Sequence, residues 1–116
     1  MQSKRVVQGM TVIVHEVEPV SMDDLRMIGD ALRRLDPEAV VVLGTREDRQ
    51  ALAMVSVPRS LTQRGLEARE LVKRIAMRFG GAGGGSALLA QAGGGDPKRL
   101  GDALAAVAEV VEELAG

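Results

Sequence analysis

The chain has 116 residues, enough for one domain with a modest core, and 46% of them are apolar although Phe79 is the only aromatic residue. The 15 basic and 16 acidic side chains give a net charge of −1, which excludes a strong general attraction to nucleic acid and leaves only a local polyanion site. The chain has no cysteine and one histidine, which excludes disulfides and a thiolate zinc site, so we expect no metal and no cofactor in this domain.

The first part of the chain predicts a strand followed by a helix. Residues 1–9 are polar and predict a flexible lead-in to a single domain over residues 10–116. Apolar and polar residues alternate in Met10–Val17, as in a half-buried strand. Ser21 follows as a helix N-cap, and apolar residues at helical spacing predict a helix over Met22–Leu35 that buries one stripe.

A hairpin and a second helix are predicted next. The valine-rich run Ala39–Leu43 is typical of a strand covered on both faces, and Gln50–Val57 predicts a second strand that returns beside it. After a loop over Arg59–Gly65, the spacing predicts a helix over Leu66–Phe79 that ends at the glycines after it.

The last part of the chain combines a glycine-rich segment with a helix. Eight of the 14 glycines lie between Gly80 and Gly95, around a short piece, ALLAQA, that predicts a brief strand. Asp96-Pro97 is a strong helix start, and apolar residues continue that helix to the end of the chain. The whole predicts a small α/β (α+β) domain, with helices on a mixed or mostly antiparallel sheet and a Gly-rich loop before the C-terminal helix.

The sequence offers no set of side chains suited to catalysis. His15 lies inside a strand pattern and is assigned a structural role, and the serines have no second histidine to act as their base. The adjacent acids Asp23 and Asp24 point to different sides of a helix, which is typical of a solvated face. No apolar run is long enough to span a membrane, and the N-terminus lacks the apolar region of a signal peptide. We therefore expect a non-catalytic, cytoplasmic domain with no membrane partner.

The glycine-rich segment raises two alternatives. A loop that opens a helix can offer backbone N–H groups to an anion. Lys98 and Arg99 lie in the first turn, where the helix dipole disfavours cations, and a phosphate beside them would relieve this conflict. The other interpretation is a tight piece of chain that closes the fold, with both side chains in water. The run GGAGGG lacks the GK[ST] ending of a P-loop and follows a helix rather than a strand, so nucleoside triphosphate binding is not expected.

Charge is distributed unevenly along the second half of the chain. Six basic and two acidic side chains over Arg59–Phe79 give a local charge of +4. Arg74 and Arg78 lie one helical turn apart and predict a basic band that leads into the glycines. The alternative is a helix with surface ion pairs such as Glu70 to Arg74. The near absence of aromatic residues argues against stacking on bases, so RNA would be contacted through its backbone and shape.

Several motifs follow one another in a recognisable order: VVVLG, a strand that leads into V-x-x-x-LT, a helix with ELV, then GG-x-GGG, AQAGG and DP-x-x-L. Between Ala39 and Leu104 this order resembles the C-terminal domain of alanyl-tRNA synthetases, a domain that is also attached to DHH-type phosphoesterases. The resemblance implies a part of an alanine–tRNA ligase that holds tRNA near its outer corner, brings the other domains of the parent synthetase together, and has its active sites elsewhere.

One segment departs from the family pattern. Many relatives continue the glycine run with Arg-Pro-Asp-Met, whereas Ser86, Ala87, Leu88 and Leu89 stand at these positions here. If the arginine contacts phosphate, this chain depends more on its backbone and on nearby cations. The predicted nucleic-acid-binding residues are the glycines of the segment and the cations around it: Gly80, Gly81, Gly83, Gly84, Gly85, Gly93, Gly94, Gly95, Lys98, Arg99, Arg74 and Arg78.

Two other functions stay open on the sequence. A protein-interaction or homodimer module would use the apolar stripe of the final helix, formed by Ala103, Ala106, Val107, Val110 and Leu114. The substrate-binding half of a DHH-type phosphoesterase would need a catalytic partner domain rich in aspartate and histidine. The expected partners are therefore tRNA, with tRNA-Ala implied by the resemblance, the other synthetase domains, and a second copy as the alternative.

Overall fold

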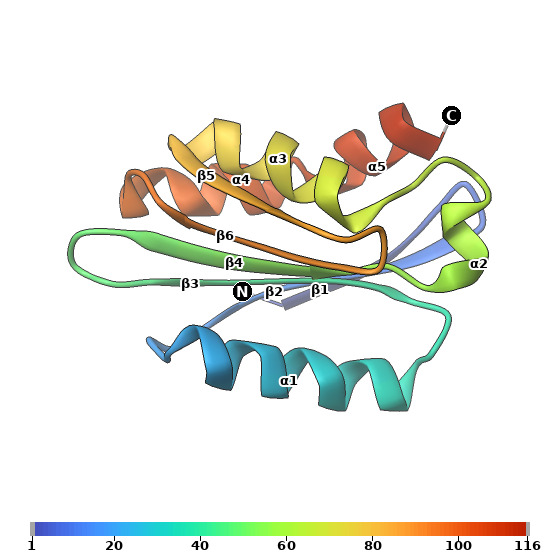
Figure 1. Cartoon of the computed structure of the whole chain (residues 1–116), viewed down its shortest axis with the longest axis horizontal. Coiled ribbons are helices and arrows are strands. Elements are labelled where there is room, and N and C mark those ends of the chain that lie inside the picture. The colour runs from blue at the N-terminus through green and yellow to red at the C-terminus, as the bar shows by residue number, and fades with distance from the viewer. Residues whose placement is uncertain (1, 116) are drawn as a thin grey trace.

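A mixed sheet of six strands forms the middle layer of the molecule, with helices on both faces (Figure 1). The computed structural model describes residues 2–115, without the side chains of residues 2 and 3. The strands are β1 (Gln2–Val7), β2 (Met10–Val17), β3 (Val40–Arg46), β4 (Ala51–Ser56), β5 (Gly81–Gly85) and β6 (Leu89–Gly94). The helices are α1 (Met22–Leu35), α2 (Arg59–Thr62), α3 (Ala68–Phe79), the 3-10 helix η1 (Pro97–Arg99), α4 (Leu100–Ala105) and α5 (Val107–Ala115).

The strand order is β1-β2-β3-β4-β6-β5, and only the β2–β3 pair is parallel. Helix α1 makes the crossover between these two parallel strands, as parallel neighbours require. It lies alone on one face, whereas α3, α4 and α5 lie on the other (Figure 1). The predicted class, a mixed and mostly antiparallel sheet with packed helices, is confirmed.

Helix α1 has the predicted bounds, because its ends carry strong local signals. The Ser21 hydroxyl accepts a hydrogen bond from the Asp24 backbone N–H at 3.1 Å, and Asp23 and Asp24 favour the positive end of the helix dipole. Gly29 is buried, and a Cβ atom there would lie 2.6 Å from the terminal methyl of Met54. The glycine therefore allows α1 to approach β4 closely.

Two apolar layers hold the sheet between its helices. The smaller core lies under α1 and includes Leu25, Leu43 and Met54. The larger core lies under α3, α4 and α5 and includes Phe79 and Leu100, both fully buried. Strand β3 is buried on both faces, which explains its unbroken valine run.

The predicted flexible lead-in over residues 1–9 is wrong for residues 2–7, which form the edge strand β1. Gln8 and Gly9 both take positive φ, 51° and 81°, and close a two-residue hairpin between Val7 and Met10. This is the pattern of a type I′ turn. Its polar sequence fits this position at the edge of the sheet, where the side chains of Lys4, Arg5 and Val6 are exposed.

Three other segments differ from the prediction. The glycine-rich loop is mostly strand, since Gly81–Gly85 forms β5 at the second edge of the sheet. The predicted loop over Arg59–Gly65 begins with the short helix α2. The final helix is divided at Ala106, between α4 and α5.

Candidate nucleic-acid interface

Two glycines close the corner where α3 ends and η1 begins. Gly80 takes a left-handed conformation with φ of 79°, and its N–H donates to the Ala76 carbonyl, which ends α3. Gly95 has a φ of 70°, and a Cβ atom there would collide with the carbonyl oxygen of Phe79. The N–H of Asp96 donates to this same carbonyl at 2.7 Å. Both glycines are required by the fold.

Alternate glycines of β5 are also required by the fold. A Cβ atom on Gly81 would collide with the ring of Phe79, and on Gly83 with the carbonyl oxygen of Gln91. The same atom on Gly85 would collide with the carbonyl oxygen of Leu89. These residues allow β5 to pack closely against β6 and the end of α3, so their absence of side chains has a structural cause.

Gly84 has a different environment, because nothing lies within 4 Å of the Cβ position there and its φ is not positive. It lines an open hollow of about 460 Å³, together with Met22, Leu52, Ala82, Gly83, Gln91, Ala92 and Gly93. The hollow lies on the sheet face that carries α1. None of the predicted cations, Lys98, Arg99, Arg74 and Arg78, lines it. The structure therefore separates the glycine surface from the cations.

The predicted cations lie at the junction of α3 with η1 and on the outer side of α3. Lys98 and Arg99 are exposed on η1, and Arg78 is exposed in the last turn of α3. The Asp96 carboxylate accepts a hydrogen bond from the Lys98 backbone N–H at 2.9 Å. The N-terminus of η1 therefore already has an anion of its own, and a bound phosphate would depend on the Lys98 and Arg99 side chains.

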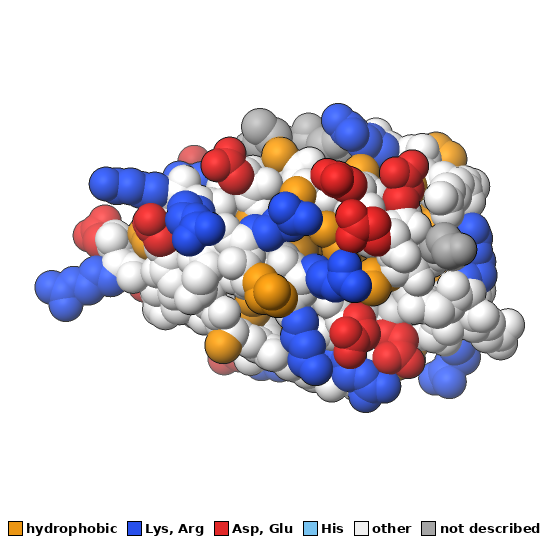
Figure 2. Space-filling model, turned by 90° about the horizontal axis from the view of Figure 1, so that it is seen from above, with side chains coloured by type: hydrophobic (Ala, Val, Ile, Leu, Met, Phe, Trp, Pro, Cys, Tyr) orange, Lys and Arg blue, Asp and Glu red, His pale blue; other side chains and the backbone are white. Residues whose placement is uncertain are grey.

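Helix α3 carries ion pairs rather than a continuous basic band. Arg74 pairs with Glu113 at 3.0 Å, and Lys73 pairs with Glu70 at 3.9 Å. This arrangement matches the alternative interpretation, although Glu70 and Arg74 pair with Lys73 and Glu113 rather than with each other. Figure 2 looks onto the molecule from the side of α3, α4 and α5 and shows basic and acidic side chains intermixed on this face. Among residues 2–115, Arg78, Lys98 and Arg99 have no ion-pair partner.

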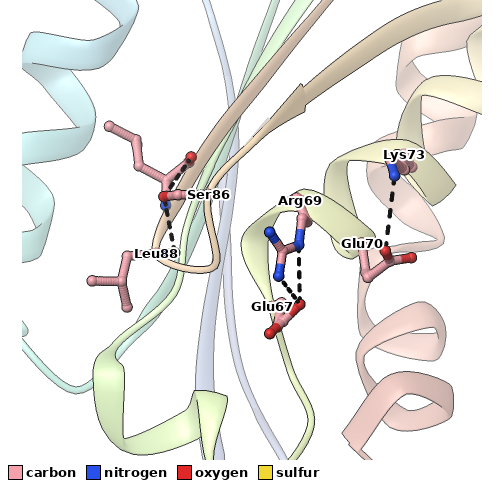
Figure 3. A network of polar contacts seen from close by, with 7 residues as sticks. Glu67, Arg69, Glu70, Lys73, Ser86 and Leu88 are labelled. Carbon is pink, nitrogen blue, oxygen red and sulfur yellow. Dashed lines mark hydrogen bonds and ion pairs between the residues drawn. The ribbon is translucent and has the colours of Figure 1, made fainter.

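Ser86, at the position of the family arginine, closes the turn between β5 and β6. Its hydroxyl accepts hydrogen bonds from the N–H groups of Leu88 and Leu89, and it donates one to the Leu89 carbonyl oxygen at 3.2 Å (Figure 3). The carbonyl oxygens of Ser86 and Ala87 accept the N–H groups of Arg69 and Ala68. The turn therefore occupies the N-terminus of α3 with backbone oxygens, and the serine has a structural role.

Sequence reasoning missed a second group of cations. Arg33 and Arg34 from α1 and Arg59 from α2 line an open hollow of about 480 Å³ at the other end of the sheet. Arg34 and Arg59 are separated by 25 positions in the sequence. The pairing of β4 with its neighbours brings them together. The sequence does show the Arg33-Arg34 doublet and Arg59 after Pro58, but no local pattern indicates that they meet.

The apolar stripe predicted as an interaction surface is used inside the domain. Ala103, Val107 and Val110 are fully buried against the sheet and α3, and Ala106 and Leu114 are half-buried. Most of this stripe is therefore covered within the domain.

His15 is half-buried in β2, and its Nδ1 atom has no hydrogen-bond partner there. Residues 2–115 contain no group of three or more His, Asp or Glu side chains placed to hold a metal ion. No helix within these residues is long and apolar enough to cross a membrane.

A protein-family model and curated alanine–tRNA ligases match this chain in sequence. Residues 9–113 match the family described as the DHHA1 domain. Alanine–tRNA ligase of Halalkalibacterium halodurans is 39% identical over 108 residues, which cover 93% of this chain and 12% of that protein. The ligase of Chloroflexus aurantiacus is 41% identical over 110 residues, with 95% and 12% covered. This chain thus spans about an eighth of the length of these relatives.

Solved structures agree with the sequence matches. The crystal structure of the C-Ala domain from Aquifex aeolicus alanyl-tRNA synthetase superposes with a TM-score of 0.85 at 25% identity, covering 95% of this chain and 98% of that one. A DHH-domain protein described as a member of the s1p family of ribosomal proteins shares the fold, with a TM-score of 0.65 and 16% identity over 28% of its length. The chain belongs to the DHHA1 domain family and is homologous to the C-terminal domain of alanyl-tRNA synthetases.

Proposed function

We propose that this chain is a non-catalytic accessory domain of an alanyl-tRNA synthetase that holds tRNA while other domains aminoacylate and edit it. The observation that carries the proposal is the match to the C-Ala domain over nearly the whole of both chains. The other synthetase domains are the implied partners, and tRNA-Ala is the implied substrate. A cytoplasmic location is a prediction that follows from this role.

The corner between α3 and η1 is the proposed contact with tRNA phosphates. Lys98 and Arg99 are exposed there without an ion-pair partner among the described residues, and Arg78 ends the helix that abuts η1. Unpaired, exposed cations can release counterions from nucleic acid without first breaking a contact inside the protein. Arg74 fits this role less well, because Glu113 neutralises it.

The glycine hollow supports the proposal in a second way. At Gly84 the strand exposes backbone without a fold requirement, so a ligand can approach the main chain closely there. No cation lines this hollow, and a contact with RNA would use backbone hydrogen bonds and shape. We therefore assign phosphate binding to the corner and retain Gly84 and Gly93 as shape contacts.

The test is tRNA affinity measured by fluorescence anisotropy for the chain and its Lys98→Glu/Arg99→Glu variant. Loss of two phosphate contacts should weaken binding by about tenfold or more at moderate salt. The control is Arg26→Glu/Lys73→Glu, which changes the charge equally at two exposed residues that already have acidic partners. Equal affinities in both variants would refute the corner as the site, and absence of binding by the unmodified chain would refute the function.

A homodimer stays an alternative prediction that the interior position of the final helix no longer supports. Sedimentation that reports a monomer at all concentrations would exclude it. The phosphoesterase half rests on likeness of fold alone, and it would need a catalytic domain elsewhere in a parent protein.

A further inference from the structure

We propose that the arginine hollow, lined by Arg33, Arg34, Arg59, Pro37, Val57, Pro58 and Leu88, is a second RNA-binding site that takes a phosphodiester segment. The inference rests in part on the proposed function, since it names a further contact for the same class of ligand. It also stands on its own geometry and can be tested separately.

Four segments distant in sequence meet at this hollow. They are the last turn of α1, the end of β4, the start of α2 and the β5–β6 turn, which all lie at one end of the sheet (Figure 1). The Ser60 hydroxyl donates to the Glu38 carboxylate at 2.8 Å, which ties the start of α2 to the chain after α1. The arginines are therefore carried by elements that are fixed relative to one another.

Two of the three arginines are free to bind a ligand. Arg33 pairs with Asp30 at 3.3 Å, whereas Arg34 and Arg59 have no ion-pair partner among residues 2–115. The helix dipole gives a structural reason for Arg33 and Arg34, because it favours cations in the last turn of α1. It does not explain Arg59, which stands at the first position of α2. The acidic residue Glu38 follows Pro37 of the hollow, and its carboxylate accepts the hydrogen bond from Ser60 instead of pairing with one of these arginines.

The floor of the hollow is apolar, which distinguishes it from the corner at η1. Val57 is buried, Pro58 and Leu88 are half-buried, and Figure 3 shows Leu88 on the side of the turn away from Glu67 and Arg69. A nucleotide presents an apolar face beside two phosphates, and arginine planes can stack on unpaired bases where aromatic rings are absent. The mixture of apolar floor and cationic rim therefore favours RNA over a simple anion.

The hollow and the η1 corner mark opposite ends of the β4–β6 ladder. Ser56 pairs with Leu89 at the hollow, and Ala51 pairs with Gly94 at the corner. Six residues of strand separate them by roughly 17–20 Å. One RNA backbone that follows the sheet could contact both ends, and the two sites should then contribute independently to affinity.

The experiment follows backbone amide resonances of the labelled chain during titration with the hexanucleotide rU6. The expected result is shifts of the amides around the hollow, at Arg34, Arg59 and Leu88. Arg34→Gln/Arg59→Gln should weaken rU6 binding about tenfold and lower the salt slope by about 1.4, since each phosphate contact on a single strand contributes about 0.7. Arg34→Lys/Arg59→Lys keeps the charge and should restore the salt slope, with only part of the affinity because lysine has no plane to stack on a base, provided that both variants keep dispersed native spectra.

Shifts confined to the η1 corner, or an Arg34→Gln/Arg59→Gln variant that binds rU6 as tightly as the unmodified chain, would overturn the inference. Shifts at the hollow with hexaglutamate but not with rU6 would overturn it in favour of an acidic protein partner. Binding of rU6 at the hollow without any binding of tRNA would support the site while refuting the proposed function. The two proposals can therefore fail separately.

Discussion

The Arg74 guanidinium lies 3.0 Å from the carboxylate of Glu113 and joins the middle of α3 to the last turns of α5. Both side chains are close to half-exposed, so solvent screens the pair. The contact crosses 39 positions of sequence, and it removes from the basic band one of the cations that the sequence assigned to RNA.

We expect Arg74→Ala to have little effect on either the stability of the domain or its affinity for tRNA. An exposed pair of this kind contributes about 0–1 kcal/mol, so the free energy of unfolding should fall by less than about 1 kcal/mol. Affinity for tRNA should fall far less than in Lys98→Glu/Arg99→Glu. Urea unfolding and anisotropy on the same samples measure both quantities, and a loss of affinity equal to that of the double variant would place Arg74 in the interface.

Two neighbouring glycines of β5 should respond in opposite ways to alanine. Gly83→Ala brings a methyl group against the Gln91 carbonyl oxygen and should cost about 1–3 kcal/mol, as overpacking does. Gly84→Ala meets open space and should leave stability unchanged or raise it by about 0.5 kcal/mol, because the unfolded chain loses freedom. Chemical denaturation measures both changes in stability. Equal losses of stability would contradict the finding that the Cβ position of Gly83 faces neighbouring atoms and that of Gly84 faces open space.

Gly84→Ala also tests the glycine hollow as an RNA surface. A methyl group on the exposed backbone should hinder close approach and weaken tRNA binding although the fold is intact. If Gly84→Ala keeps both its stability and its affinity for tRNA, Gly84 has no role in binding.

Ser86→Ala should destabilise the turn between β5 and β6. The hydroxyl accepts the N–H groups of Leu88 and Leu89 at 3.3 and 3.1 Å, and their loss should cost about 1 kcal/mol. Thermal unfolding measures the cost. If Ser86→Ala is as stable as the parent, the serine hydroxyl does not stabilise the turn.

The pair of Arg46 and Glu16 should stabilise the domain at neutral pH without making its stability pH-dependent there. The two groups form a bidentate contact at 2.8 and 2.9 Å, and hydrogen bonding to Glu16 raises the pKa of Arg46. A raised pKa gives stabilisation that is fully present below the unfolded value and is lost only as the pH rises through the folded value, which lies in strongly alkaline solution. Arg46→Ala should cost about 1 kcal/mol equally at pH 6.5 and 8.5, and unequal costs in urea unfolding would contradict this.

Local signals made part of the fold predictable. Ser21, the acids after it and the helical spacing of apolar residues fixed both ends of α1, and the valine run of β3 indicated a strand buried on both faces. The motif order then placed the chain in its family. These features depend on near neighbours in the sequence, where periodicity and capping are informative.

Other features depend on contacts that no local pattern records. Strand β5 is nearly all glycine and carries no periodicity, so its sequence predicts a loop. Strand β1 is polar because it lies at the edge of the sheet, where it pairs with β2 and contacts α5. The separation of Gly84 from Lys98, and the meeting of Arg34 with Arg59, follow from strand pairing across long stretches of chain.

The most direct test of the central claim is the salt dependence of tRNA binding by the unmodified chain, measured by fluorescence anisotropy between about 50 and 200 mM salt. The account predicts binding at the lower concentration and a steep, linear fall of log affinity with log salt, as expected when cations at the η1 corner contact several phosphates. Absence of binding at about 50 mM salt, or an affinity that salt does not change, would contradict a tRNA-holding role for this domain.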